Sequence, residues 1–210
     1  MLPPFPDARQ RAVPALFPLL CLLSAFWALP ALAGETKPLP FATLFGGPFE
    51  LVDHHGAVRR DSDFHGQFVL VSFGYTHCPD ICPTTLQLVT EAMDLLGDAG
   101  ARVQPIFVSI DPARDDVASL ASYMAHFHPR LLGLTGSEAQ VRAAAKVYKL
   151  HRRKVILPDA GGPDDYLVDH GSMLYLMGPD GGFVTLFHFR QANAETVAAT
   201  IARYLADARS

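Results

Sequence analysis

Apolar runs alternate with amphipathic segments along most of this chain. Residues 68–73 and 103–110 are almost continuously apolar, which is typical of strands buried on both faces of a parallel sheet. Residues 83–96 and 117–127 instead carry their apolar residues at helical spacing. This order of segments predicts an α/β domain in which crossover helices connect parallel strands.

Weaker patterns in the neighbouring residues predict further short strands and a third helix. Residues 49–52 alternate and predict a short edge strand, and residues 131–134 predict another short strand. A third helix is expected to begin at Ser137, because Ser137 and Gln140 form a capping-box pair. Residues 150–157 predict a polar strand.

The C-terminal pattern is that of a hairpin and a last helix. Residues 172–177 and 183–189 flank a Gly/Pro/Asp turn, and residues 158–165 before them predict a loop. Asn193 is a suitable N-cap for a closing amphipathic helix. Parallel units followed by an antiparallel hairpin and a closing helix predict a thioredoxin-like fold, with a central mixed sheet flanked by helices.

The N-terminus differs in kind from the rest of the chain. Arg9 and Arg11 precede residues 12–33, a largely apolar run without a charged residue that ends in a small-x-small pattern at Ala33. This pattern predicts a signal peptide that is cleaved after Ala33. A run of about 20 residues is also long enough for a retained membrane anchor. In both cases the rest of the chain is exported, and the signal-like start favours the bacterial periplasm, at the inner membrane if residues 12–33 are retained.

Three regions follow from these patterns. Residues 1–33 are the predicted signal peptide or anchor, residues 34–46 are a Pro-rich linker, and residues 47–208 form the folded domain. The formal net charge of −4 argues against a nucleic-acid partner. Of the three cysteines, only Cys78 and Cys82 lie in the folded domain. In an exported domain such a pair indicates either a disulfide or a soft-metal site.

The cysteine pair lies between the first buried strand and the first helix. Residues four apart in a helical turn have Cβ atoms about 5–6 Å apart, so a modest adjustment would allow a disulfide. The N-terminus of a helix also favours thiolate over thiol. Two anionic sulfurs select soft metals, above all Cu(I). A third ligand is expected to be an imidazole, and His170 is favoured because its loop precedes a strand predicted to lie beside residues 68–73.

Short motifs around these positions resemble the Sco/SenC family. They are GYTxCPDxCPT at residues 74–84, DPxRD at 111–115, PR at 129–130, GLTG at 133–136 and DH at 169–170. The similarity extends from about Gly47 to Tyr204, and the CxxxCP motif with a distant Asp-His pair is specific.

The resemblance carries expectations about fold and function. It implies a thioredoxin-like, exported or membrane-associated protein with one copper ion, as Cu(I) or Cu(II), held by Cys78, Cys82 and His170. It also implies delivery of copper to the binuclear copper site of cytochrome c oxidase, or reduction of the cysteines of that site. The copper-site subunit of the oxidase, other copper chaperones and thioredoxin-like reductases are the implied partners.

Residues next to the expected ligands need separate interpretation. His77 stands where the family usually has an apolar or aromatic residue, and we expect it to face solvent, with modulation of the adjacent Cys78 as the alternative. Asp169 is either a plain turn residue or a hydrogen-bond partner of His170. Asp80 is expected to be exposed and available to guide a partner.

Other polar residues receive structural interpretations. Asp111 and Asp115 resemble paired carboxylates, but turn and cap roles are favoured over acid–base work. The His54-His55 pair lies in a predicted turn and is expected to be solvated.

Two functions remain open from the sequence. A copper-binding assembly factor, a metallochaperone and not a turnover enzyme, needs His170 as a ligand. A thiol-disulfide reductase needs only Cys78 and Cys82. A peroxidase is disfavoured because no Thr-x-x-Cys loop is evident, and a structural zinc site because only two sulfurs are present.

Overall fold

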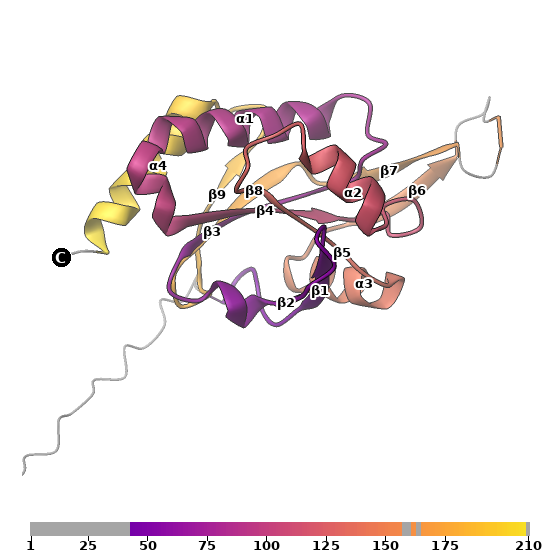
Figure 1. The fold of residues 1–210 in the computed structure, drawn as a ribbon, viewed down its shortest axis with the longest axis horizontal. Helices are drawn as coiled ribbons and strands as arrows, with labels where there is room; N and C mark the ends of the chain where they lie inside the picture. Colours follow the sequence, from indigo (N-terminus) through magenta and orange to yellow (C-terminus); the bar gives the residue numbers. More distant parts are fainter. Residues whose placement is uncertain (1–42, 157–160, 163–164, 209–210) are drawn as a thin grey trace, which may run out of the picture. The chain divides into compact units, whose positions relative to one another are not determined.

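The computed structural model describes residues 43–156, 161–162 and 165–208 (Figure 1). A seven-stranded sheet has the order β2-β1-β5-β4-β3-β8-β9, and β6 and β7 form a separate two-stranded sheet. The strands are β1 (Glu50–Asp53), β2 (Val58–Arg60), β3 (Phe68–Gly74), β4 (Val103–Ser109), β5 (Leu132–Thr135), β6 (Arg152–Ile156), β7 (Tyr166–His170), β8 (Met173–Met177) and β9 (Phe183–His188). The helices are α1 (Ile81–Leu96), α2 (Val117–Met124), α3 (Glu138–Val147) and α4 (Ala194–Asp207), with short 3-10 helices η1 (Asp61–Phe64) and η2 (Gly97–Arg102).

The large sheet is mixed, as the sequence predicts. Strands β3, β4 and β5 are parallel to one another, with Phe68 opposite Val103 and Ile106 opposite Leu132. Strand β8 pairs antiparallel with β3 and continues through the predicted hairpin into β9. Helix α4 then closes the domain, and Asn193 caps it by accepting a hydrogen bond from the Thr196 N–H.

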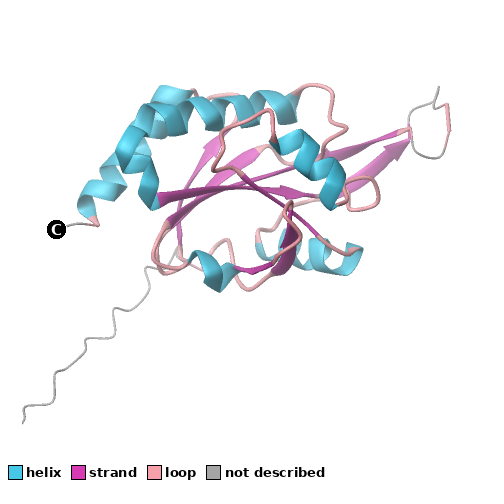
Figure 2. Cartoon of the chain, in the orientation of Figure 1, coloured by secondary structure: helices cyan, strands magenta, loops and turns pink. Residues whose placement is uncertain are grey.

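Strand β3 is buried on both faces of this sheet. Alternate side chains point to opposite faces, so Leu70 packs in one apolar cluster and Val71 in the other. Helices α1, α2 and α4 supply the first cluster, and α3 with β1 supplies the second. Figures 1 and 2 show these two layers on either side of the sheet. The continuous apolar run in the sequence is therefore explained by a strand between two helical layers.

The first strand is not at the edge of the sheet, which corrects the prediction for residues 49–52. Strand β1 lies between β2 and β5, and β2 forms the edge. Gly56, with φ 89°, allows the chain to turn back. The Asp53 carboxylate accepts hydrogen bonds from the His55 and Ala57 N–H groups and so stabilises this turn. The polar side chains of Arg59 and Arg60 concealed the edge strand in the sequence.

The predicted polar strand at residues 150–157 is present as β6, but its partner β7 was missed. Strand β7 begins with three apolar residues, so the sequence lacks the period-two alternation of a half-buried strand. Most of the predicted loop at residues 158–165 lies outside the described residues. His170 is therefore the last residue of a strand and not part of a loop.

The predicted N-terminal segment, residues 1–33, lies outside the described residues. Within the described ranges, none of the helices combines the length and the apolar character needed to cross a membrane. Phe45, near the end of the predicted linker, packs against the rings of Tyr175 and Phe183, with centroids 5.3 and 5.0 Å apart. Contacts with the domain therefore begin before Gly47.

Candidate metal centre

The cysteine pair lies where β3 passes into α1. The helix begins at Ile81, two residues earlier than predicted, so Cys82 lies in its first turn and Cys78 in the loop before it. Cys82 is 3% exposed and belongs to an apolar cluster, whereas Cys78 is half-buried. Neither forms a disulfide. The two sulfurs therefore differ in access, with Cys78 facing outward.

Gly74, the last residue of β3, lets the helix approach the strand. A Cβ atom at this position would lie 2.7 Å from Cys82 Sγ and 2.7 Å from a ring carbon of Phe107. Both distances are shorter than van der Waals contact, and both neighbours are buried. Only a glycine fits here without displacing the cysteine or the ring.

The two thiols have opposite electrostatic environments. The pKa of Cys78 is lowered to about 5, first because the Cys82 side chain hydrogen-bonds to it and then because the backbone N–H groups of Asp80, Cys82 and Ile81 do so. The pKa of Cys82 is raised, because its S–H serves as that donor and because it is buried. Cys78 is therefore the thiolate, stabilised by the first turn of the helix.

His170 approaches this pair from β7, across 88 positions of sequence. Its Nε2 lies 3.8 Å from Cys82 Sγ, and its Nδ1 lies 2.9 Å from the carbonyl oxygen of Gly171. A carbonyl oxygen only accepts hydrogen bonds, so Nδ1 carries a proton and Nε2 is the ring nitrogen that faces the sulfur. The ring also packs edge-on against Tyr75, with centroids 6.1 Å apart. Tyr75 and the Gly171 carbonyl thus orient the imidazole.

Two of the three predicted ligands share one opening, and Cys82 is buried beside it. Cys78 and His170 line a pocket of about 420 Å³ together with Tyr75, Pro79, Ile81 and Leu167. Sulfur and nitrogen bonded to one ion at about 2.3 and 2.0 Å, about 120° apart, are about 3.7 Å from each other, which the Cys82–His170 distance matches. Within the described ranges no three Cys, His, Asp or Glu side chains are already grouped to hold a metal. Binding an ion here would therefore require one ligand to adjust.

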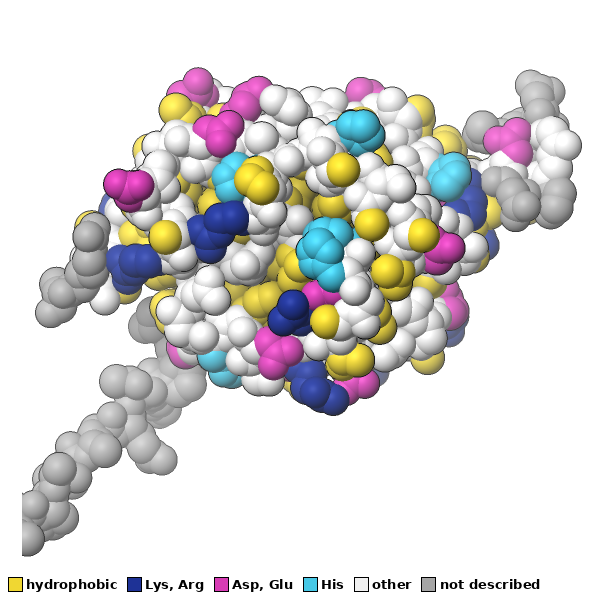
Figure 3. All heavy atoms as spheres, in the orientation of Figure 1, with side chains coloured by type: hydrophobic (Ala, Val, Ile, Leu, Met, Phe, Trp, Pro, Cys, Tyr) yellow, Lys and Arg dark blue, Asp and Glu magenta, His cyan; other side chains and the backbone are white. Residues whose placement is uncertain are grey.

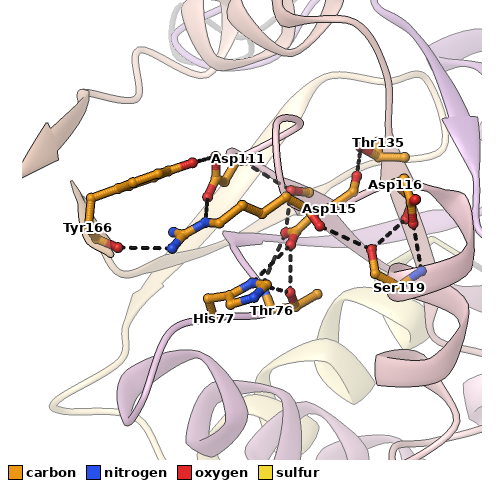
Figure 4. Close-up of polar contacts among 10 residues, drawn as sticks. Thr76, His77, Asp111, Asp115, Asp116, Ser119, Thr135 and Tyr166 are labelled. Carbon is orange, nitrogen blue, oxygen red and sulfur yellow. Dashed lines mark hydrogen bonds and ion pairs between the residues drawn. The ribbon is translucent and has the colours of Figure 1, made fainter. Parts of the chain in front are cut away.

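A buried ion pair anchors the strand that carries His170. The Asp111 carboxylate accepts hydrogen bonds from Arg114 Nε at 2.5 Å and from the Tyr166 hydroxyl at 2.8 Å (Figure 4). Arg114 in turn donates to the Tyr166 carbonyl at 3.1 Å, and its guanidinium lies 3.7 Å from the centroid of the Tyr166 ring. Tyr166 begins β7, so these contacts hold the strand against the loop after β4.

A second buried carboxylate anchors the loop that carries Cys78. Asp115 accepts hydrogen bonds from the Thr76 N–H at 3.0 Å, the Thr76 hydroxyl at 2.6 Å and the Ser109 hydroxyl at 2.6 Å. His77 Nδ1 lies 3.0 Å from the Thr76 hydroxyl and 3.8 Å from Asp115. Figure 4 shows His77 and Thr76 beside Asp115. The side chain of His77 is 52% exposed, so it lies at the surface as expected and is directed toward Asp115.

Both buried carboxylates differ from their predicted roles. The sequence favoured turn and cap roles for Asp111 and Asp115, but both are fully buried, and the N-cap of α2 is Asp116, which accepts from the Ser119 N–H at 2.7 Å. Two acidic residues directly after an apolar strand were the available signal. Their burial could not be read from a segment that is polar throughout.

Two further expectations need correction. Asp169 lies 3.5 Å from Arg153 and does not hydrogen-bond to His170, because neighbouring residues of a strand point to opposite faces. His54 is not simply solvated, since its Nδ1 accepts a hydrogen bond from the Gly133 N–H at 2.9 Å. Burial lowers the pKa of His54, and the electrostatic interaction with His55 lowers it further. Asp80 is exposed, as predicted.

The fold and the site together define a class of protein. A mixed sheet with a thiolate and a buried thiol at the start of the first helix is the arrangement of thioredoxin-like proteins that bind metals or exchange disulfides. The SCO1/SenC family matches residues 37–206 of this chain. The chain therefore belongs to the SCO1/SenC family.

Known relatives agree with this assignment. The chain is 44% identical over 181 residues to "Protein SCO2 homolog, mitochondrial" of Homo sapiens, a match that covers 84% of this chain and 65% of that protein. The copper-bound ScoI of Arabidopsis thaliana has a TM-score of 0.71 at 34% identity, covering 78% of this chain and 99% of that one. The copper-bound ScoI of Bradyrhizobium japonicum has a TM-score of 0.70 at 39% identity, covering 76% and 99%. The predicted thioredoxin-like fold is confirmed.

Proposed function

We propose that this protein is a copper-binding assembly factor that delivers copper to the binuclear copper site of cytochrome c oxidase. The observation that carries the proposal is the 3.8 Å approach of His170 Nε2 to Cys82 Sγ, beside the Cys78 thiolate. Two sulfurs and an imidazole form a donor set that suits Cu(I). Membership of the SCO1/SenC family and the copper-bound structures of two relatives support the same assignment.

The three side chains would contribute in different ways. Cys78 is already a thiolate and half-buried, so it is suited to take up copper first. Cys82 holds a proton that has to leave before its sulfur can bind, so uptake releases a proton. His170 presents its Nε2 from a separate strand. We propose that these residues hold one ion, as Cu(I) or Cu(II), and release it by ligand exchange to the oxidase subunit.

Copper stoichiometry tests this proposal. The reduced chain, in a non-ionic detergent, is titrated with copper beside the variant His170→Ala. We expect one ion per chain, and an affinity that is at least about tenfold weaker in the variant, because one of three ligands is lost. His151→Ala, which removes an exposed histidine outside this pocket, is the matched control and should bind like the unaltered protein. Tight binding by His170→Ala would refute the three-ligand site.

A thiol-disulfide reductase is the second candidate, and one observation favours it. Cys78 is accessible, and Cys82 is buried beside it. This arrangement suits an attacking cysteine at Cys78 and a resolving cysteine at Cys82. In this reaction Cys78 attacks a target disulfide, and Cys82 then displaces the target. The products are a Cys78–Cys82 disulfide and a reduced target, which receives two electrons from the pair, one proton from Cys82 and one proton from solvent.

The histidine distinguishes the two functions. Disulfide exchange does not need His170, so His170→Ala should reduce a model disulfide at an unchanged rate while losing copper. Reductase activity without measurable copper binding by the unaltered protein would make the second candidate the function. Metal binding without exchange activity would exclude it.

We also propose that residues 1–33 direct export to the periplasm, and that residues 12–33, if retained, anchor the protein at the inner membrane, with residues 34–46 as the linker. The support is the basic, apolar and small-residue pattern of this segment. Sequencing the N-terminus of the protein isolated from its cells tests this. A mature start at Gly34 would indicate cleavage, an intact start in the membrane fraction would indicate an anchor, and an intact protein in the cytosol would contradict export.

A further inference from the structure

Basic residues are concentrated in one stretch of this acidic chain. The formal net charge is −4, yet residues 141–156 contain six of the chain's 17 Lys and Arg residues and none of its 21 Asp and Glu residues. By contrast, on the face drawn in Figure 3 the basic side chains (dark blue) are scattered among acidic and other ones. The stretch runs from α3 through a tight turn into β6. Five of its six cationic residues are exposed, and Arg152 is half-buried.

These residues line one groove. It has a volume of about 960 Å³ and lies between α3, the β6 strand and the loop after β4. Its cationic side chains are Arg142, Lys146, Lys149, Arg152, Arg153 and Lys154. One carboxylate, Glu138, also lines it. The groove is therefore concave and strongly positive.

The single carboxylate is already shared between two cations. Glu138 is 2.7 Å from Arg152 and 2.9 Å from Arg142. Hydrogen bonds from Arg152, followed by those from Arg142, lower the pKa of Glu138 to about 2, although partial burial opposes this. Among the described residues no carboxylate forms an ion pair with Lys146, Lys149 or Lys154. The Lys154 ammonium lies 4.0 Å from the centroid of the Tyr166 ring, a contact that leaves it, like the other two lysines, able to pair with an anionic ligand.

Lys149 occupies a backbone position at which glycine would be less strained. Its φ is 54°, and it is the single non-glycine residue with positive φ in the described ranges. It follows the end of α3, where the Leu150 N–H donates to the Ala145 carbonyl in a helix-ending turn that usually contains glycine. The Lys149 ammonium lies 5.7 Å from the centroid of the Phe45 ring, which directs it along the surface. A strained lysine in a cationic groove suggests that its side chain is used.

The groove adjoins the pocket that Cys78 and His170 line, which we call the sulfur pocket. Strands β6 and β7 form one antiparallel pair, which supplies Arg152 to the groove and His170 to the pocket. Val168 lines both. A molecule bound in the groove would therefore lie next to the opening at Cys78.

We propose that this groove is a docking site for an acidic segment of a protein partner. Carboxylates of the segment would pair with Lys146, Lys149 and Lys154 and bring the partner beside the sulfur pocket. The concave shape favours an extended segment of chain over the flat surface of a bilayer. This proposal does not rest on copper, because the charge pattern and the groove are independent of the metal.

Binding of a fluorescent octaglutamate peptide to the full copper-free chain tests the proposal. The chain is kept in a non-ionic detergent at low ionic strength, and binding is followed by fluorescence anisotropy. We expect saturable binding that weakens with salt, and no binding of octalysine. The double variant Lys146→Glu, Lys149→Glu should bind at least about tenfold more weakly, because attraction becomes repulsion at two positions.

Two variants separate a docking site from general charge. Arg203→Glu makes the same kind of charge change on α4, across the sheet from α3, and should alter binding less than about twofold. Lys149→Gly relieves the positive φ, so it should keep or raise the melting temperature while weakening binding about two- to fivefold. A folded Lys149→Gly protein excludes misfolding as the reason for lost affinity.

Three results would overturn the proposal. They are failure of octaglutamate to bind, equal weakening by Arg203→Glu, and displacement of the peptide by detergent micelles that contain phosphatidylglycerol but not by those that contain phosphatidylcholine. The last result would assign the groove to an anionic lipid headgroup. Because copper is absent throughout, none of these results bears on the copper site, which the His170→Ala titration tests separately.

Discussion

The cysteines and the histidine of the proposed copper site are held by parts of the domain that differ in depth of packing. Cys82 is 3% exposed and lies on α1, a helix packed against α4 and the central sheet. His170 ends β7, which among the described residues pairs with β6 alone. Strand β6 is largely exposed, and Ile156 at its end is 75% accessible. One side of the site is built into the core, and the other lies on a surface ribbon.

This difference explains why the Asp111, Arg114 and Tyr166 cluster is present. A two-stranded ribbon is marginally stable on its own. The buried Asp111 carboxylate and the Arg114 guanidinium fix the first residue of β7, four positions before His170. On the cysteine side the buried Asp115 carboxylate holds the loop before Cys78, but α1 and β3 themselves are stabilised by apolar burial. Substitutions should therefore affect the two sides separately.

The largest effect is expected from Arg114→Met. Removing the guanidinium leaves the buried Asp111 carboxylate without its cation, which should lower the free energy of unfolding by about 3–5 kcal/mol. Copper affinity should fall because β7 loses its anchor, while alkylation of Cys78 stays close to its original rate. Urea unfolding and copper titration measure the two effects.

Arg153→Met is the matched control, because it removes an exposed cation from the same ribbon. Its partner Asp169 lies at 3.5 Å and both side chains are more than half exposed, so the loss should be below about 1 kcal/mol. Equal losses for both variants would show that the Asp111–Arg114 pair has no special role in anchoring β7.

A smaller effect is expected on the other side of the site from Gly74→Ala. The added methyl would lie 2.7 Å from Cys82 Sγ, so the start of α1 has to shift at a cost of about 1–3 kcal/mol. Reactivity of the cysteine pair should change, measured by the rate of disulfide formation. Gly162→Ala, which has open space around its Cβ position, should change neither stability nor this rate. A neutral Gly74→Ala would contradict the close approach.

The third prediction concerns Cys82→Ala and depends on pH. Cys78 is alkylated as the thiolate, so its rate in the unaltered protein should rise through about pH 5 and be maximal at pH 7. Without the Cys82 hydrogen bond, the pKa of Cys78 should rise toward its ordinary value of 9.0, and the rate at pH 6 should fall. Iodoacetamide labelling followed by peptide mass spectrometry gives both profiles. Identical profiles would mean that the backbone N–H groups alone stabilise the thiolate.

The smallest effect is expected from Asp169→Asn. The carboxylate is exposed and faces Arg153, so stability should change by no more than about 0.5 kcal/mol and copper affinity should not change. A copper affinity reduced about tenfold or more would instead restore Asp169 as a partner of His170.

Local patterns in the sequence predicted most of the elements. The capping residues Ser137 and Asn193 mark the starts of α3 and α4, as expected. The apolar run at residues 68–73 is the buried strand β3, and the Gly/Pro/Asp turn forms the β8–β9 hairpin. Each of these depends on residues within a few positions of one another, which is why periodicity and capping rules apply to them.

The sequence predicted less well which residues from distant parts of the chain contact one another. The strand β7 was missed, and the pairing of Asp169 with Arg153 and the burial of Asp111 and Asp115 were not predicted. In each case the deciding neighbour lies on another element, or the face of a strand depends on a register that a single segment does not reveal.

The sequence by itself determined that Cys78 and Cys82 lie between a buried strand and a helix, because the motif and its flanking segments are contiguous. Only the tertiary structure decided that His170 Nε2 lies 3.8 Å from Cys82 Sγ and that Cys78 is the thiolate of the pair. The distance joins residues 88 positions apart, and it is set by the packing of β7 on the Asp111–Arg114 pair. The ionisation of Cys78 depends on the direction of one S–H group and three backbone N–H groups, which come together only once α1 has folded.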